Sequence, residues 1–163
     1  MIVLGIDPGL VNTGWGVIET QGSRLRCVAY GCITTRAHAT AAERLAEIHG
    51  GIAAVIDRYD PACCGIENVY FSNNAHTAFA TGQARGVALL AAAGLEIGEY
   101  GPGEIKQAVV GAGSADKRQV QYMVRAILGL EQEPQPDHAA DALAAAITHA
   151  HLRVARSIGA SAR

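Results

Sequence analysis

Residues 1–34 read MIVLGIDPGLVNTGWGVIETQGSRLRCVAYGCIT, and this stretch decides the class of fold. It opens with apolar, β-branched residues, which are typical of a buried strand. Pro-Gly, Asn-Thr-Gly and Gln-Gly-Ser groups then interrupt it at intervals, as tight turns do. We therefore predict three strands, over residues 1–7, 14–20 and 25–34. Consecutive strands joined by such short turns form an antiparallel meander.

The rest of the chain alternates helical patterns with short apolar runs. Thr40 followed by Glu43 is a capping box, and apolar residues then recur at helical spacing. The predicted helices run from the Thr40 cap to Tyr59, from the Asn74 cap to Ala93, briefly from Pro102, from the Ser114 cap to Leu128, and from Asp137 to Ala155. Further strands are predicted over residues 62–67 and 95–100. A meander joined to right-handed crossovers predicts an α/β fold: a mixed five-stranded sheet, three antiparallel strands followed by parallel ones, flanked by helices.

Length and composition limit the classes of protein to which this chain can belong. The 163 residues, 50% of them hydrophobic, suffice for one domain, which we place at residues 1–155, with a disordered tail over 156–163. The net charge of −2 gives no indication of a nucleic-acid partner. No apolar run approaches the roughly 20 residues of a membrane helix and no basic lead-in opens the chain, so we expect a cytoplasmic protein without membrane contact. The cysteines form no CxxC pair and are predicted to be buried, reduced thiols: Cys27, Cys32, Cys63 and Cys64.

Three acidic residues stand where a core element ends or begins. Asp7 directly follows the apolar strand IVLGI, and Glu67 directly follows CCGI. A carboxylate at the end of a buried strand is costly unless a cation or several donors meet it. Asp141 shares a face of the last helix with His138, away from the apolar stripe that contains Leu143. Two strand ends and one helix start can converge, and a mainly oxygen ligand set suits Mg²⁺ or Mn²⁺ better than zinc.

Each of these residues also has an ordinary structural explanation. Asp7 before Pro8 can form a turn, and Glu67 can be an exposed strand end. Asp137 is a good helix N-cap, and an acid at position 141 is favoured by the helix dipole. A histidine such as His138 at the start of a helix is more often a surface residue than a ligand. The joint placement of the acids favours the metal site.

Four separate segments resemble the RuvC family of Holliday junction (crossover junction) endodeoxyribonucleases. They are LGIDPGLVNTGWGVI, GIENVYFSNNAHTA with GQARGVA, VVGAGSADKRQVQ and DHAADALAAAITHAH, in order over residues 1–151. The resemblance implies an RNase H-like fold, a homodimer, two divalent metal ions (Mg²⁺ or Mn²⁺) per active site, and paired symmetric nicks in four-way junction DNA during recombination and repair. It also implies that the protein acts together with the RuvA–RuvB branch-migration complex and is associated with the nucleoid.

By position, the resemblance makes Asp7, Glu67, His138 and Asp141 the catalytic and metal-binding residues. Many family members have aspartate where His138 stands and others have histidine, so the imidazole bears on metal preference and favours Mn²⁺. Asp137, one residue upstream, could be taken for the missing acid. We expect His138 to be the ligand and Asp137 the helix cap, with the reverse assignment open.

The resemblance also implies contacts with DNA. The basic residues near position 110 match family positions that hold the phosphate backbone, and Ser114 lies at a predicted helix start, which favours phosphate. Tyr70 matches an aromatic residue that can stack on an unpaired base at the junction centre. The alternatives are that the cations form a solvated face and that the aromatic residues belong to the core. The candidates for DNA contact are Tyr70, Asn73, Arg85, Lys106, Ser114, Lys117 and Arg118.

The predicted helix over residues 74–93 carries a candidate dimer contact. Gly82 and Gly86 lie on one of its faces, where each costs about 1 kcal/mol relative to alanine. Close approach of another backbone would justify that cost, so we place the dimer partner near this helix. Phe79, Val87 and Leu90 are predicted to form its apolar side.

Three other functions fit parts of the sequence. IDPGLVNTG resembles the phosphate loop of actin-like ATPases and sugar kinases, but the chain is too short for their two lobes, and no GxxxxGK[ST] motif occurs. A non-catalytic junction-binding module of the same fold is favoured only by the histidine at position 138. An RNase H-like nuclease acting on RNA is the third alternative, which a panel of substrates would distinguish.

Overall fold

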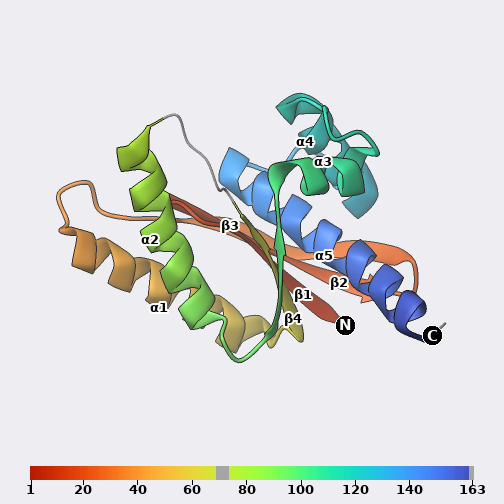
Figure 1. The fold of residues 1–163 in the computed structure, drawn as a ribbon, viewed down its shortest axis with the longest axis horizontal. Helices are drawn as coiled ribbons and strands as arrows, with labels where there is room; N and C mark the ends of the chain where they lie inside the picture. The colour runs from red at the N-terminus through yellow and green to blue at the C-terminus, as the bar shows by residue number, and fades with distance from the viewer. Residues whose placement is uncertain (69–73, 162–163) are drawn as a thin grey trace.

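The computed structural model describes residues 1–68 and 74–161, which form a five-stranded mixed sheet with helices on both faces (Figure 1). The strands are β1 (Ile2–Asp7), β2 (Asn12–Gln21), β3 (Arg24–Thr34), β4 (Cys63–Glu67) and β5 (Glu96–Tyr100), in the order β3-β2-β1-β4-β5. β2 pairs antiparallel with β1 and with β3, whereas β4 pairs parallel with β1 and with β5. The predicted meander and the mixed sheet are confirmed.

The helices form two layers, one on each face of the sheet. They are α1 (Ala41–Tyr59), α2 (Ala75–Ala91), α3 (Pro102–Val110), α4 (Lys117–Leu128) and α5 (Asp137–Ser161). α1 and α2 cover one face, while α5 covers the other together with α3 and α4 (Figure 1). Neighbouring strand residues serve opposite layers, because Leu4 packs in the core under α1 and Val3 in the core under α5. The predicted capping box of Thr40 and Glu43 opens α1.

The register of the sheet brings two of the predicted acids to the same edge. β1 and β4 run side by side, with Ile6 opposite Ile66. Asp7 and Glu67, the next residues, are therefore neighbours at the carboxyl ends of two parallel strands. In open α/β sheets this edge is the usual position of a functional site.

The backbone of α5 lies directly against that of the sheet. A Cβ atom on Gly5 would lie 1.9 Å from the carbonyl oxygen of Ala142, and one on Gly14 would lie 1.8 Å from that of His138. Only glycine fits at these two strand positions. We predicted one apolar stripe on this helix, but every residue from Ala142 to Ile147 is buried, because the sheet covers one side and α3 and α4 cover the other.

The predicted start of α4 is wrong. We expected Ser114 to cap this helix, but Ser114 lies in the preceding turn and the N-cap is Asp116. The Asp116 side chain accepts a hydrogen bond from the amide of Gln119 at 2.9 Å, and the Gln119 side chain accepts one from the amide of Asp116 at 2.8 Å. This reciprocal capping box satisfies two backbone donors, which a serine two residues earlier could not do.

The predicted start of α5 at Asp137 is confirmed, but the predicted role of Asp137 as the helix cap and the predicted end of the helix are wrong. The carbonyl oxygen of Pro136 accepts the first helical hydrogen bonds, so Asp137 is the first helical residue and not the cap. The helix continues to Ser161, past the predicted end at Ala155. No proline interrupts residues 156–161, so nothing in their sequence blocks the helical hydrogen bonds.

The apolar side predicted for α2 is confirmed only in part. Asn74 caps the helix as expected. Phe79 and Leu90, however, are 68% and 66% exposed, while the buried residues are Ala84 and Ala88. Val87 packs against the core as predicted, whereas Phe79 and Leu90 point away from it.

The four cysteines are free thiols, of which Cys63 and Cys64 are buried whereas Cys27 and Cys32 are only half-buried. The prediction of buried thiols is therefore confirmed for the pair on β4 and wrong for the pair on β3. Within the two described ranges, no helix combines the length and the apolar character needed to cross a membrane.

Candidate active site

The candidate site lies where β1 and β4 end and α5 begins. Asp7 is the last residue of β1 and Glu67 the last residue of β4. His138 and Asp141 belong to the first turns of α5. The close contact between Gly14 and the His138 backbone holds this end of the helix against the sheet. Side chains that are far apart in the sequence thus meet at one edge of the fold.

Asp7 and His138 form a direct pair. Nδ1 of the imidazole lies 2.7 Å from Oδ2 of Asp7. Asp7 is only 9% exposed, so the imidazole replaces water as a partner of its carboxylate. The hydrogen bond to Asp7 raises the pKa of His138, which favours the protonated ring. The ring must lose that proton before it can bind a metal ion.

Glu67 lies in surroundings that oppose its ionisation. Burial raises the pKa of Glu67, and the charges of Asp7 and Asp141 add to the effect, so that it reaches about 8. The pKa of Asp141 is also raised, by burial first and then by the charge of Asp7. Crowded carboxylates of this kind are stabilised by a cation, and such perturbed groups are common at functional sites.

Lys117 brings positive charge to the same place. Its Nζ lies 3.0 Å from Oδ2 of Asp137 and 3.4 Å from Oδ2 of Asp141. Burial lowers the pKa of Lys117, but the two carboxylates outweigh burial and the pKa is raised overall. Nε2 of Gln121 donates a further hydrogen bond to Oδ1 of Asp137 at 3.0 Å. These contacts were not predicted, because we assigned Asp137 to capping.

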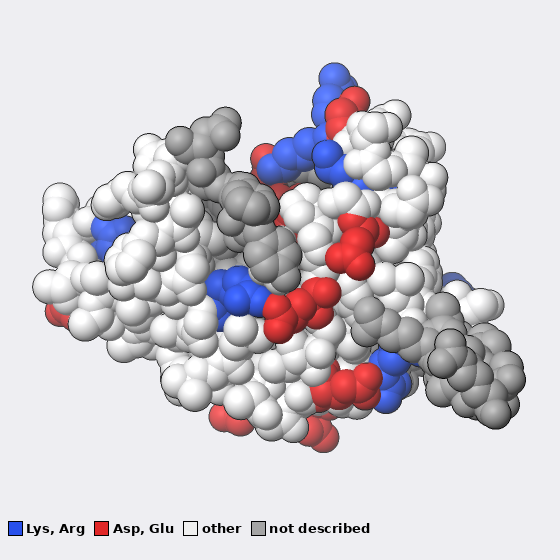
Figure 2. Space-filling model, in the orientation of Figure 1, with Lys and Arg blue, Asp and Glu red and all other residues white. Residues whose placement is uncertain are grey.

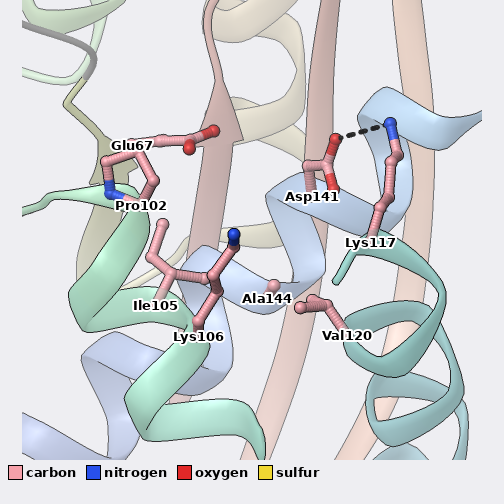
Figure 3. A pocket seen from close by; sticks show the side chains of 8 residues that line it. All are labelled: Glu67, Pro102, Ile105, Lys106, Lys117, Val120, Asp141 and Ala144. Carbon is pink, nitrogen blue, oxygen red and sulfur yellow. Dashed lines mark ion pairs between the residues drawn. The ribbon is translucent and has the colours of Figure 1, made fainter. Parts of the chain in front are cut away.

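A pocket of about 180 Å³ lies between these groups (Figure 3). Its apolar wall comes from α3, α4 and α5, through Pro102, Ile105, Val120 and Ala144. Its polar rim consists of Glu67, Asp141, Lys106 and Lys117. Figure 3 shows the side chains of Glu67 and Lys106 pointing into the space that separates them from Asp141. Carboxylates that can hold cations therefore face ammonium groups that can hold phosphate.

The donor set fits a hard divalent cation. Three carboxylates and one imidazole are offered by Asp7, Glu67, Asp141 and His138, and such oxygen-rich sets suit Mg²⁺ or Mn²⁺. Within residues 1–68 and 74–161, no three His, Cys, Asp or Glu side chains are gathered closely enough to hold an ion as they stand. Asp7 is instead hydrogen-bonded to His138, and Asp141 forms an ion pair with Lys117.

The predicted basic contacts fall in two places. Lys106 and Lys117 line the pocket, whereas Arg118 lines a separate groove on the outer side of α4, together with Tyr122. Ser114 is exposed in the turn before α4. Figure 2 shows Lys and Arg side chains gathered over α4, at one end of the visible face. Two of the predicted basic contacts, Lys106 and Lys117, thus lie beside the acids.

Arg85 is engaged within the protein. It forms an ion pair with Glu99, and the same carboxylate accepts a hydrogen bond from Nδ2 of Asn68 at 3.3 Å. This network ties α2 and β5 to the residue that follows Glu67. Sequence reasoning assigned no role to Asn68, which directly follows Glu67, or to Glu99. Tyr70 and Asn73 lie outside the described residues.

Comparisons with known proteins match most of this chain. The family model described as "Crossover junction endodeoxyribonuclease RuvC" matches residues 3–149. The crossover junction endodeoxyribonuclease RuvC of Heliobacterium modesticaldum is 52% identical over 153 residues, covering 93% of this chain and 94% of the relative. That of Treponema denticola is 51% identical over 152 residues, covering 92% of this chain and 85% of the relative. The solved structure of "T. thermophilus RuvC in complex with Holliday junction substrate" is 40% identical with a TM-score of 0.89, covering 95% of this chain and 96% of that one.

Proposed function

Because the chain belongs to the RuvC family of crossover junction endodeoxyribonucleases, we propose that it is a metal-dependent endonuclease that resolves four-way DNA junctions by paired symmetric nicks, in recombination and repair. We assign the activity to a single domain over residues 1–155. The observation that carries the proposal is the convergence of four side chains at one edge of the sheet, beside a rim of lysines. These side chains are Asp7, Glu67, His138 and Asp141.

We assign the metal-binding and catalytic roles to these four residues, with two Mg²⁺ or Mn²⁺ ions per active site. Such ions activate a water and stabilise the leaving oxygen of an in-line displacement. Asp7 lies beside the end of β4 and against the start of α5, so it would help to hold the ions together with residues of both elements. Glu67 would complete one set of ligands, and His138 with Asp141 the other.

The chain's own residues must rearrange before cleavage. His138 has to give up the proton that its bond to Asp7 favours, and Lys117 has to leave Asp141. We assign Lys106 and Lys117 to the phosphate backbone at the pocket rim, because both line the pocket beside the acids. The other DNA contacts that we propose are Tyr70, Asn73, Arg85, Ser114 and Arg118.

We further propose a homodimer formed through the exposed face of α2. Phe79 and Leu90 are large, apolar and exposed on this helix, and a Cβ atom on Gly82 or Gly86 would meet nothing within 4 Å. A two-fold dimer presents two sites to a junction that has two-fold symmetry of its own. Family membership also supports the RuvA–RuvB branch-migration complex as a partner and a cytoplasmic, nucleoid-associated location.

The test is cleavage of a labelled, mobile four-way junction beside a linear duplex of the same sequence and a duplex with RNA in one strand. Reactions contain Mg²⁺, Mn²⁺ or EDTA. The variants are Asp7→Asn, which removes a charge at the centre of the site, and Asp57→Asn, which removes one from the exposed surface of α1. We expect paired symmetric cuts in the junction alone, lost in EDTA and with Asp7→Asn and kept with Asp57→Asn.

Two outcomes would contradict this function. Binding of the junction without cutting in either metal would indicate a recognition module that has lost the chemistry. Preferred cutting of the RNA-containing duplex would indicate a ribonuclease of the same fold.

A further inference from the structure

Lys117 forms ion pairs with two carboxylates that differ in their surroundings. Asp137 and Asp141 lie four residues apart on α5, so their side chains share one face of the helix. The Lys117 ammonium reaches both, at 3.0 Å and 3.4 Å. Figure 3 shows the pair with Asp141 at the edge of the pocket. One lysine on α4 thus has two partners a helical turn apart.

The two partners differ in how they are held. The Asp141 side chain is 28% exposed and lines the pocket with Glu67, whereas the Asp137 side chain is 54% exposed and does not line it. Asp137 is fixed from its other oxygen by Gln121, a buried residue of α4. Asp137 therefore offers Lys117 a preformed carboxylate just outside the site.

We propose that Asp137 is a positioning residue: it receives the Lys117 ammonium when a divalent cation takes Asp141, and keeps the lysine at the pocket rim. The inference rests on the proposed metal-dependent function, because it concerns competition between a cation and the Lys117 ammonium for the Asp141 carboxylate. Without Asp137, Lys117 would have only Asp141 and would compete with the cation for it. With Asp137, the shift from one partner to the other is short and leaves the lysine where DNA phosphate would meet it.

An ordinary alternative is that the Asp137–Lys117 pair only fastens α4 to α5, or that Asp137 only adds negative charge near the metal ligands. Loss of a fastening lowers stability without requiring a change in cation affinity. Loss of general negative charge weakens cation binding whether or not Lys117 is present. The proposal predicts a weakening that depends on Lys117, which neither alternative does.

The experiment is calorimetric titration of Mn²⁺ into the DNA-free protein, for wild type, Asp137→Asn, Lys117→Met and the double variant. We expect Asp137→Asn to weaken Mn²⁺ binding about fivefold, the factor that corresponds to one exposed ion pair. Lys117→Met should strengthen binding, and Asp137→Asn should then have no further effect. Asp137→Glu should restore most of the wild-type affinity. Glu131→Gln, which removes an exposed charge before α5, is the matched control and should change nothing.

Equal weakening by Asp137→Asn with and without Lys117 would overturn the proposal, and so would no weakening at all. Melting temperatures in EDTA, measured on the same proteins, identify a variant that is merely less stable. Junction cleavage by wild type is measured in parallel. Cleavage together with a Lys117-independent effect overturns the role of Asp137 alone, whereas absence of both cleavage and Mn²⁺ binding overturns the proposed function with it.

Discussion

Nδ1 of His138 lies 2.7 Å from Oδ2 of Asp7, and this contact joins the end of β1 to the start of α5. The two residues are 131 positions apart in the sequence, so the hydrogen bond exists only in the folded protein. It pairs the most buried acid of the site with its one imidazole. A carboxylate in place of the imidazole would instead set two negative charges against each other, and would depend on metal to hold them together.

His138 is therefore the residue at which metal preference can be changed. We expect His138→Asp to raise the ratio of the cleavage rate in Mg²⁺ to that in Mn²⁺ by about tenfold, because carboxylates favour Mg²⁺ more than imidazole does. The measurement is single-turnover cleavage of a four-way junction in each metal. His49→Asp, at an exposed position of α1, is the control. An unchanged ratio would show that His138 is not a ligand.

Glu67 should make the metal-free protein less stable at higher pH. Its pKa of about 8 in the folded protein exceeds the ordinary glutamate value of 4.5, so the folded state binds the proton more tightly. The stability from this proton is complete below the unfolded pKa and is lost as pH rises toward the folded one. The free energy of unfolding of wild type, measured with urea in EDTA, should fall relative to Glu67→Gln by at most about 1.4 kcal/mol per pH unit in that window. Glu131→Gln should follow wild type, and parallel curves for all three proteins would refute the expectation.

The lysines of the pocket rim should contribute to the salt dependence of junction binding. In an Asp7→Asn background, which prevents cutting, we expect Lys106→Gln and Lys117→Gln each to reduce the slope of log affinity against log salt by about 0.9. Arg118→Gln tests whether the outer groove of α4 also contacts phosphate. Arg26→Gln removes an exposed charge on β3 that pairs with Glu19, and should leave the slope unchanged. An unchanged slope for a rim lysine would remove that residue from the DNA contacts.

The dimer should depend on the exposed face of α2. Replacing Phe79 and Leu90 together by glutamate places two charges in the proposed contact, so the dissociation constant of the dimer should rise about thirtyfold or more. Sedimentation equilibrium measures it. Tyr122→Glu is the control, because Tyr122 is 57% exposed on α4, far from α2 in Figure 1. If Tyr122→Glu dissociates the dimer and the α2 variant does not, the interface lies on α4 instead.

Gly14 should tolerate no side chain. The Cβ atom of Gly14→Ala would lie 1.8 Å from the carbonyl oxygen of His138, so α5 must move. We expect a loss of about 3 kcal/mol in the free energy of unfolding, together with loss of cleavage. Gly50→Ala on α1, where a Cβ atom meets nothing within 4 Å, should be neutral or stabilising. Normal cleavage by Gly14→Ala would show that the helix position does not matter to the site.

The mixed five-stranded sheet and the cap of α1 were predictable because they follow from local patterns. Apolar runs broken by turn residues mark strands, and Thr40 with Glu43 marks a helix start regardless of tertiary contacts. The position of the acids was predictable for a similar reason, since Asp7 and Glu67 end strands that must be neighbours in such a fold.

Contacts between distant elements were not predictable. The exposure of Phe79 depends on how closely α2 approaches α1, and no local pattern records that distance. The choice between Ser114 and Asp116 as cap was decided by Gln119, which completes the reciprocal hydrogen bonds. The pairs in the site, Asp7 with His138 and Lys117 with Asp141, join segments whose spacing in the sequence carries no signal of contact.

At Gly5 and Gly14 the last helix touches the sheet through main-chain atoms. Main-chain atoms have no alternative rotamers. The distance between the site residues on the strands and those on α5 is therefore fixed, and substitutions elsewhere in the core cannot change it in small steps. Adaptation to an ion of different radius or hardness must then come from exchanging the side chains themselves. Position 138 offers such an exchange, because its side chain can change while its backbone stays against the strand.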